Sequence, residues 1–68
     1  MTQKELLYLE DAIGHEKSII SIIDQSMDIV EDTNIKNYFE TEKTCHQNTV
    51  DNLMSVLEKN NAWSNFIR

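Results

Sequence analysis

Hydrophobic side chains recur through the first half of the chain at alternating intervals of three and four residues. This spacing is typical of one face of a helix that packs against a partner helix. Seven of the eight positions on this face are apolar, and the exception is Glu16, near its middle. The positions are Leu6, Leu9, Ile13, Glu16, Ile20, Ile23, Met27 and Val30. The pattern predicts a helix from about Gln3 to about Glu31, started by a capping box of Thr2 and Glu5.

A second apolar set lies beside this face and widens the hydrophobic surface. It comprises Ala12, Ile19, Ile22 and Ile29. The isoleucines between Ile19 and Ile23 alone span roughly 160° of the helix circumference, at about 100° per residue. One neighbouring helix does not cover so wide an arc, so we expect this helix to contact two or more others. Gly14 lies inside the same helix, where it either marks the close approach of another helix or is simply tolerated.

A second helix is predicted from about residue 35 to residue 60, after a break at residues 32–34. Asp, Thr and Asn in the break are good capping residues, and so short a connection makes the two helices antiparallel neighbours. The inner face of the second helix reads Ile35, Phe39, Glu42, His46, Thr49 or Val50, Leu53, and Val56 or Leu57. Asn60 and Asn61 should end the helix, because Asn accepts the left-handed C-terminal conformation. In the tail, Trp63 either folds back onto the end of the helices or binds a partner.

The small size of the chain favours self-association. A single domain of 68 residues has a marginal core and usually depends on disulfides, metals or oligomerisation. Cys45 is the only cysteine, which excludes an internal disulfide and fits a reducing compartment. We therefore predict an all-α fold in which one antiparallel hairpin, residues 1–68, pairs with a second copy as a homodimeric four-helix bundle.

The distribution of charge excludes some partners. The net charge of −6 argues against a nucleic-acid binder. Residues 1–34 carry two lysines against eight acids, whereas residues 35–68 carry four basic and four acidic groups. Two copies of the first helix should therefore repel each other if their polar faces meet. The polar, acidic start of the chain does not resemble a signal peptide, and no apolar run approaches transmembrane length. From these features alone we expect a cytoplasmic protein without membrane contact.

Polar residues interrupt both apolar faces near their middle. An antiparallel hairpin that turns near residue 33 pairs positions summing to about 66, which brings Glu16 towards His46 with Glu42 somewhat closer to the turn. In a dimer these residues would supply four carboxylates and two imidazoles, the ligand inventory of a site for two Fe, Mn or Zn ions. The spacing departs from the Glu-x-x-His pattern of di-iron proteins, since Lys43 stands where that pattern needs a carboxylate. The alternative is a polar layer that fixes helix register and the dimer partner.

Catalytic motifs are absent from the sequence. It contains neither a glycine-rich phosphate loop nor a nucleophile elbow. Cys45 and His46 do not form a protease dyad, because adjacent residues of a helix point in different directions. We therefore expect no enzymatic activity, no catalytic residues and no organic cofactor.

Several short segments resemble the Coat F family of spore coat proteins, a ferritin-like group from endospore-forming bacteria. The resemblance lies in residues 9–17 (LEDAIGHEK), the break at residues 32–34, the region of His46, and residues 54–63. Members of that family tend to carry a Glu-Lys pair in the first helix, matched here by Glu16 and Lys17. The resemblance implies a helical bundle of ferritin-like type and a place in the spore coat or the sporulating cell.

Three functions are compatible with these features. The leading hypothesis is a structural, self-associating helical protein that resembles a spore coat component and contacts other coat proteins. The second hypothesis is a metal-binding bundle that uses Glu16, Glu42 and His46 from both chains. The third is a regulatory hairpin that docks on a larger protein through the isoleucine arc.

Overall fold

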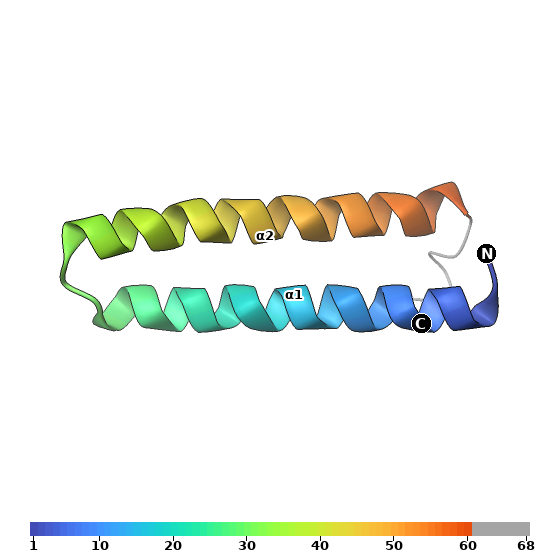
Figure 1. Cartoon of the computed structure of the whole chain (residues 1–68), viewed down its shortest axis with the longest axis horizontal. Coiled ribbons are helices and arrows are strands. Elements are labelled where there is room, and N and C mark those ends of the chain that lie inside the picture. The colour runs from blue at the N-terminus through green and yellow to red at the C-terminus, as the bar shows by residue number, and fades with distance from the viewer. Residues whose placement is uncertain (61–68) are drawn as a thin grey trace.

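The computed structural model describes residues 1–60, which form two antiparallel α helices joined by a short turn (Figure 1). Helix α1 spans Gln3–Ile29 and helix α2 spans Thr33–Lys59. The helices lie side by side along nearly their full length, in a structure whose long axis measures 45 Å. The predicted all-helical hairpin is therefore confirmed. Within the described residues, neither helix combines the length and hydropathy that a membrane span requires.

The start of α1 is fixed by the predicted capping box. The backbone N–H of Glu5 donates to Oγ1 of Thr2 over 3.1 Å, and Oε1 of Glu5 accepts from the backbone N–H of Thr2 over 2.8 Å. Both bonds satisfy N–H groups that have no partner within a helix. The hydrogen bond from the Thr2 backbone N–H lowers the pKa of the Glu5 carboxyl, and the Thr2 hydroxyl lowers it further by a smaller amount.

The turn occupies residues 30–32, two residues earlier in the chain than the predicted residues 32–34. Helix α1 ends at Ile29 rather than at residue 31, and α2 begins at Thr33 rather than at residue 35. Asp32 causes the second difference, because its side chain caps α2 by accepting from the backbone N–H of Ile35 over 3.0 Å. Residues 33 and 34 then fall in the first helical turn, where Thr and Asn cost less than in a helix interior.

The end of α2 agrees with the prediction in position but differs in conformation. Asn60 follows the last helical residue, and its φ of −98° is not left-handed as predicted. Its side-chain amide instead donates to the carbonyl of Val56 over 2.9 Å, so the helix end is satisfied without a left-handed residue. The predictions for Asn61 and Trp63 lie outside the described residues.

The predicted inner faces largely match the observed burial. All eight positions predicted on α1 are buried or half-buried. The sequence leaves two positions on α2 open, Thr49 or Val50 and Val56 or Leu57. Val50 and Leu57 are the buried ones, whereas Val56 is exposed. The placement of Ile35 on the inner face was wrong, since 46% of this residue is exposed. It lies in the first turn of α2, three residues before the exposed Tyr38, and it shares the orientation of Tyr38 rather than that of Phe39.

The core is unevenly distributed along the hairpin. We call residues 3–15 and 47–59 the terminal half, and residues 17–29 and 33–45 the turn half. Three buried side chains, Ile13, Val50 and Leu57, form one cluster in the terminal half. Partly buried residues pack around this cluster, namely Leu6, Leu9, Ile20, Leu53 and Met54. In the turn half, Ile23 is the buried hydrophobic residue, and it lies outside the cluster.

Gly14 does not serve the packing of the two helices. A Cβ atom at this position would meet no heavy atom within 4 Å. The hairpin therefore has no close helix approach at Gly14, which is one of the two roles considered for it.

Candidate functional site

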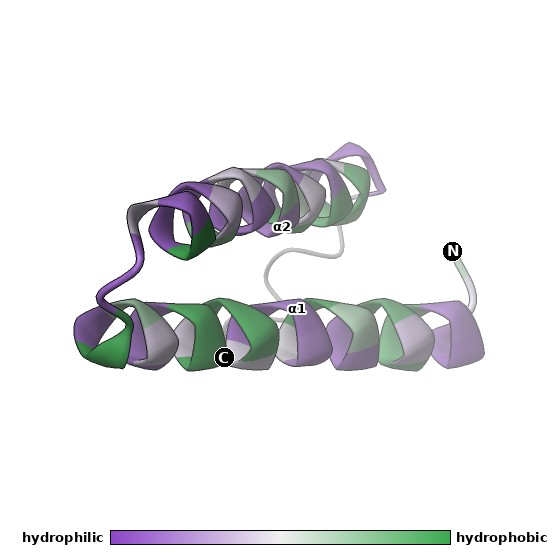
Figure 2. Cartoon of the chain, turned by 60° about the vertical axis from the view of Figure 1, so that its left-hand side comes forward, coloured by the Kyte–Doolittle hydropathy of each residue, from purple (hydrophilic) through white to green (hydrophobic). Residues whose placement is uncertain are grey.

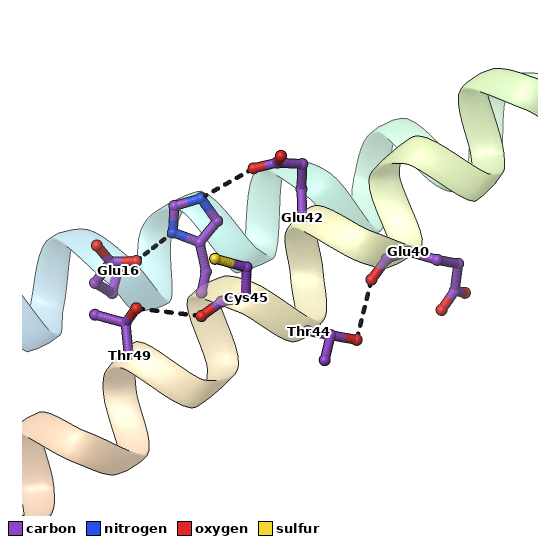
Figure 3. Close-up of polar contacts among 7 residues, drawn as sticks. Glu16, Glu40, Glu42, Thr44, Cys45 and Thr49 are labelled. Atoms are coloured by element: carbon purple, nitrogen blue, oxygen red, sulfur yellow. Dashed lines mark hydrogen bonds and ion pairs between the residues drawn. The ribbon is translucent and has the colours of Figure 1, made fainter.

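A polar layer separates the two halves of the hairpin. The imidazole of His46 lies between two carboxylates, one from each helix (Figure 3). Its Nδ1 is hydrogen-bonded to Oε2 of Glu16 on α1, and its Nε2 lies 3.6 Å from Oε2 of Glu42, one turn earlier on α2. The predicted proximity of Glu16 and His46 is confirmed.

Local spacing explains this arrangement. Glu42 and His46 are four residues apart, which places them on the same face of α2. The antiparallel register then brings Glu16 of α1 to the other edge of the ring. The Glu16 and His46 side chains retain 22% and 25% exposure, so water reaches the layer from one side. Polar groups in this position keep their hydration in part, which reduces the cost of placing them within an apolar seam.

The chemistry of the layer follows from the two nitrogen positions. A neutral imidazole donates from one nitrogen only, whereas the protonated ring donates from both. The protonated ring would therefore keep its hydrogen bond to Glu16 and also form an ion pair with Glu42. The layer is suited to a charge-assisted hydrogen bond between the helices, which is stronger than a neutral one.

The layer does not form a chelating cluster within one hairpin. The two carboxylates lie on opposite edges of the ring, so they do not converge on a common point with either nitrogen. Within residues 1–60, no group of three or more His, Cys, Asp or Glu side chains is placed to hold a metal ion. Binding Fe, Mn or Zn through Glu16, Glu42 and His46 would require the carboxylates to turn towards one nitrogen, or ligands from a second copy. Metal binding stays a prediction.

An ion pair that the sequence analysis missed joins the helices in the turn half. Nζ of Lys43 lies 2.7 Å from Oδ1 of Asp24, and this hydrogen bond raises the pKa of Lys43. The pairing sum of 67 agrees with the expected antiparallel register, which could have identified the pair. Both side chains are largely exposed, so the contribution to stability is small.

The hydroxyl groups near the layer are used by the backbone of α2. Oγ1 of Thr49 donates to the carbonyl of Cys45, and Oγ1 of Thr44 donates to that of Glu40, each over 3.1 Å (Figure 3). Such bonds allow threonine to sit inside a helix without an unpaired hydroxyl. The Cys45 thiol is free and exposed, whereas the neighbouring His46 ring is engaged by the carboxylates.

A second row of side chains runs along α1 beside the packed face. Its positions are Tyr8, Ala12, His15, Ile19, Ile22, Ser26 and Ile29. They alternate by four and three residues, and each directly precedes a position of the packed face. The row therefore lies about 100° around the helix from that face. The sequence analysis identified the apolar members of this row but not its regular repeat.

A corresponding row follows α2. It consists of Ile35, Tyr38, Glu42, Cys45, Thr49, Asn52 and Val56. Residues 38, 45, 49, 52 and 56 likewise each precede a residue that is buried or half-buried against α1. Because the helices are antiparallel and face each other, the same rotation brings both rows to one side of the hairpin. The two rows together form a second surface, roughly perpendicular to the interface between the helices.

Large apolar side chains are exposed on this surface. We call the five that lie in its turn half the apolar flank: Ile19, Ile22 and Ile29 on α1, and Ile35 and Tyr38 on α2. Ile22 and Ile29 are 61% and 79% exposed. Figure 2 shows hydrophobic segments at successive turns of α1. The opposite side of the hairpin is polar, since it carries the pair of Asp24 and Lys43.

The hairpin thus offers two candidate features, a half-buried polar layer at its centre and an apolar flank near its turn. The layer connects α1 to α2 within one chain, whereas the flank has no cover within residues 1–60. Comparison of the chain with protein-family models, with curated proteins and with solved structures finds no match.

Proposed function

We propose that this protein is a small structural protein that acts by self-association, with two hairpins forming a four-helix bundle of ferritin-like type. The single observation that carries the proposal is the apolar flank. Exposed isoleucines scattered singly are ordinary, but here they follow two heptad-like rows on one side of the hairpin. Such spacing is what a helix presents to a further helix.

The surface area of the chain supports this proposal. The chain exposes 5123 Å² of solvent-accessible surface. Compact monomers of its 8.0 kDa mass expose about 4,450 Å² by the usual scaling with mass. The excess of roughly 700 Å² reflects the elongated shape of an open two-helix hairpin, and packing against a second copy would reduce it.

The polar layer has a defined role in such a bundle. Glu42 belongs to both the inner face of α2 and its second row, so the layer reaches the surface that the second copy would cover. A polar layer inside an otherwise apolar seam specifies the register and number of helices, at some cost in stability. We therefore assign Glu16, Glu42 and His46 a structural role in aligning the helices.

The cellular role follows from the resemblance to Coat F proteins. A non-enzymatic hairpin that self-associates suits the spore coat, where it would contact other coat proteins, or the cytoplasm of the sporulating cell. The side opposite the flank, which carries the pair of Asp24 and Lys43, would stay in contact with solvent, and the net charge of −6 would oppose further association of bundles.

Sedimentation equilibrium tests the proposal. We expect a dimer for the wild type and a monomer for Ile22→Glu, because the substitution places a charge in the centre of the proposed interface. Leu7→Glu is the matched control: Leu7 is also apolar and 55% exposed, but it belongs to neither row. This control should remain dimeric.

The alternative functions give different results on the same samples. A wild-type monomer that keeps its helical content would contradict self-association and favour docking on a larger protein. Stoichiometric Fe, Mn or Zn by elemental analysis, lost in Glu16→Ala, would favour the metal-binding bundle. We expect purified wild-type protein to form dimers whose melting temperature does not change when any of these metals is added.

A further inference from the structure

We infer that the two copies associate with their turns at the same end of the bundle, so that α1 of each copy lies on α2 of the other. This inference rests on the proposed dimer and specifies its geometry. The two-fold axis then runs along the bundle, and the turn half of one hairpin packs on the turn half of its partner. The competing arrangement places the turns at opposite ends and stacks α1 on α1.

The first argument is the position of the apolar residues along the hairpin. All five residues of the apolar flank belong to the turn half. On the same surface the terminal half exposes two large apolar residues, Tyr8 and Val56. Its other positions are small or polar, namely Ala12, His15, Thr49 and Asn52, whereas the turn half has three such positions, Ser26, Glu42 and Cys45, beside its five large apolar ones. With the turns together, the apolar flanks of the two copies cover each other.

With the turns at opposite ends, the flank would meet the wrong surface. The midpoint of the hairpin lies near Glu16 and His46, so Ile19 would fall opposite residues 12–15 of the partner copy. Ile29 would fall opposite the first turn of the partner's α1. The isoleucines would then lie against His15 and other polar groups, whose desolvation opposes association.

The second argument is independent and concerns charge. Residues 1–34 carry two lysines and eight acids, whereas residues 35–68 are balanced at four basic and four acidic groups. With the turns at opposite ends, α1 stacks on α1 and brings two strongly acidic helices together. With the turns at the same end, each acidic α1 lies on a nearly neutral α2. The acids of α1 lie outside the row that would form the interface, so this repulsion acts between whole helices rather than between contacting groups, and it also favours the same-end arrangement.

Pulsed electron–electron resonance on spin-labelled full-length protein tests the arrangement. Cys45→Ser removes the native thiol, and Asn34→Cys then places one label per chain in the exposed first turn of α2. Packed helices lie 8–10 Å apart, so two labels at the same end of a bundle should be separated by no more than roughly 25 Å. Labels at opposite ends would be separated by about the 45 Å length of the hairpin or more.

Two further label positions make each result decisive. Gln3→Cys, also in the Cys45→Ser background, labels the other end and should give a short distance as well. Gln47→Cys, again in the Cys45→Ser background, labels an exposed position near the midpoint and outside both rows, so its distance is similar in either arrangement and reports association alone. A Gln47 distance well below the hairpin length, with long Asn34 and Gln3 distances, would overturn the inferred arrangement and leave the dimer standing.

The remaining outcomes are also distinct. If none of the three labels shows dipolar coupling and the mass is that of a monomer, the dimer fails and the arrangement fails with it. A two-peaked Asn34 distribution, with short and long distances both populated, would show that the flank does not select one arrangement and would overturn the inference.

Discussion

The terminal half and the turn half of this hairpin solve the same packing problem differently. In the terminal half, Ile13, Val50 and Leu57 form one cluster in which none is more than 2% exposed, and partly buried hydrophobic residues pack around it. In the turn half, Ile23 is buried, but five large apolar side chains face outward. The same two helices therefore bury a cluster of side chains in the terminal half and leave large apolar side chains exposed in the turn half. In the proposed dimer, the two helices of the second copy would cover the turn half.

The difference originates in the second row of α1. In the terminal half this row reads Tyr8, Ala12 and His15, which one hairpin can leave in water at little cost. In the turn half it reads Ile19, Ile22 and Ile29 around a single serine. Each of these isoleucines would contribute roughly 1.5–3 kcal/mol if fully buried. Most of the hydrophobic free energy available for association therefore comes from residues near the turn.

The largest expected effect compares one side chain from each half. Leu57→Ala should destabilise the fold by about 2–5 kcal/mol at any protein concentration, because Leu57 is 0% exposed in the single hairpin. Ile22→Ala should cost less than about 0.5 kcal/mol in dilute monomer and more in the dimer. Urea denaturation at two protein concentrations measures both.

Equal losses for the two variants in dilute protein would remove the distinction between the halves. If Leu57→Ala does not fold, Leu57→Met keeps the test open, because a swap of similar volume should cost less than about 1.5 kcal/mol.

The boundary between the halves gives the next effect. His46→Leu should destabilise the hairpin by about 1–2 kcal/mol, since it leaves Glu16 half-buried without its hydrogen bond. The double variant Glu16→Leu/His46→Leu should recover much of that loss, because an apolar pair often replaces a buried ion pair without penalty. Thermal unfolding of the two variants measures the recovery. A double variant as unstable as the single one would show that the layer supports the fold by more than mutual compensation.

Gly14 tests whether the terminal half has a hidden contact. Gly14→Ala should stabilise the protein by about 1 kcal/mol, because a Cβ there enters open space and alanine favours the helix. The melting temperature should rise by about 4–8 °C, and the dimer should be unaffected since Gly14 lies outside both rows. Weaker association of this variant would place Gly14 at an interface and extend the contact surface beyond the proposed one.

The smallest effect concerns the cap at the terminal end. Hydrogen bonds from Thr2 lower the pKa of Glu5 below its ordinary value of 4.5, so ionised Glu5 stabilises the folded state. This contribution is fully present above pH 4.5 and is lost as the pH falls through the lower folded pKa. The difference in melting temperature between wild type and Glu5→Ala should therefore shrink from pH 7 to pH 3. Asp11→Ala, also exposed on α1 but outside the cap, is the control. A difference that does not change with pH would mean that the Glu5 carboxylate has no role in the cap.

Much of the fold could be predicted from the sequence because helix periodicity is a strong signal. The packed face of α1, the capping box and the meeting of Glu16 with His46 all follow from regular spacing and antiparallel geometry. The ends of the helices were less predictable, because Asp32 determines where α2 begins and it competes with two neighbouring residues of similar capping ability. Ile35 shows a further limit: it lies four residues before Phe39 on the inner face and three before the exposed Tyr38, and spacing alone does not decide which of the two rows it joins.

The candidate site was predictable in its residues but not in its geometry. Spacing places Glu42 and His46 on one face, yet it does not show that the carboxylates lie on opposite edges of the imidazole. That detail depends on side-chain rotamers and on the axial offset between the helices, and it decides whether three groups can meet at one ion.

Because of the outward-facing isoleucines, the stability of the proposed dimer would depend on how much of this protein a cell contains. By mass action, a fold completed by a second copy gains stability as its own abundance rises. At low abundance the chains would be monomers that expose the apolar flank to proteases and to unrelated proteins. At high abundance they would form dimers in which the flank is covered. The expression level would then decide whether the protein exists mainly as a protease-sensitive monomer or as a stable dimer.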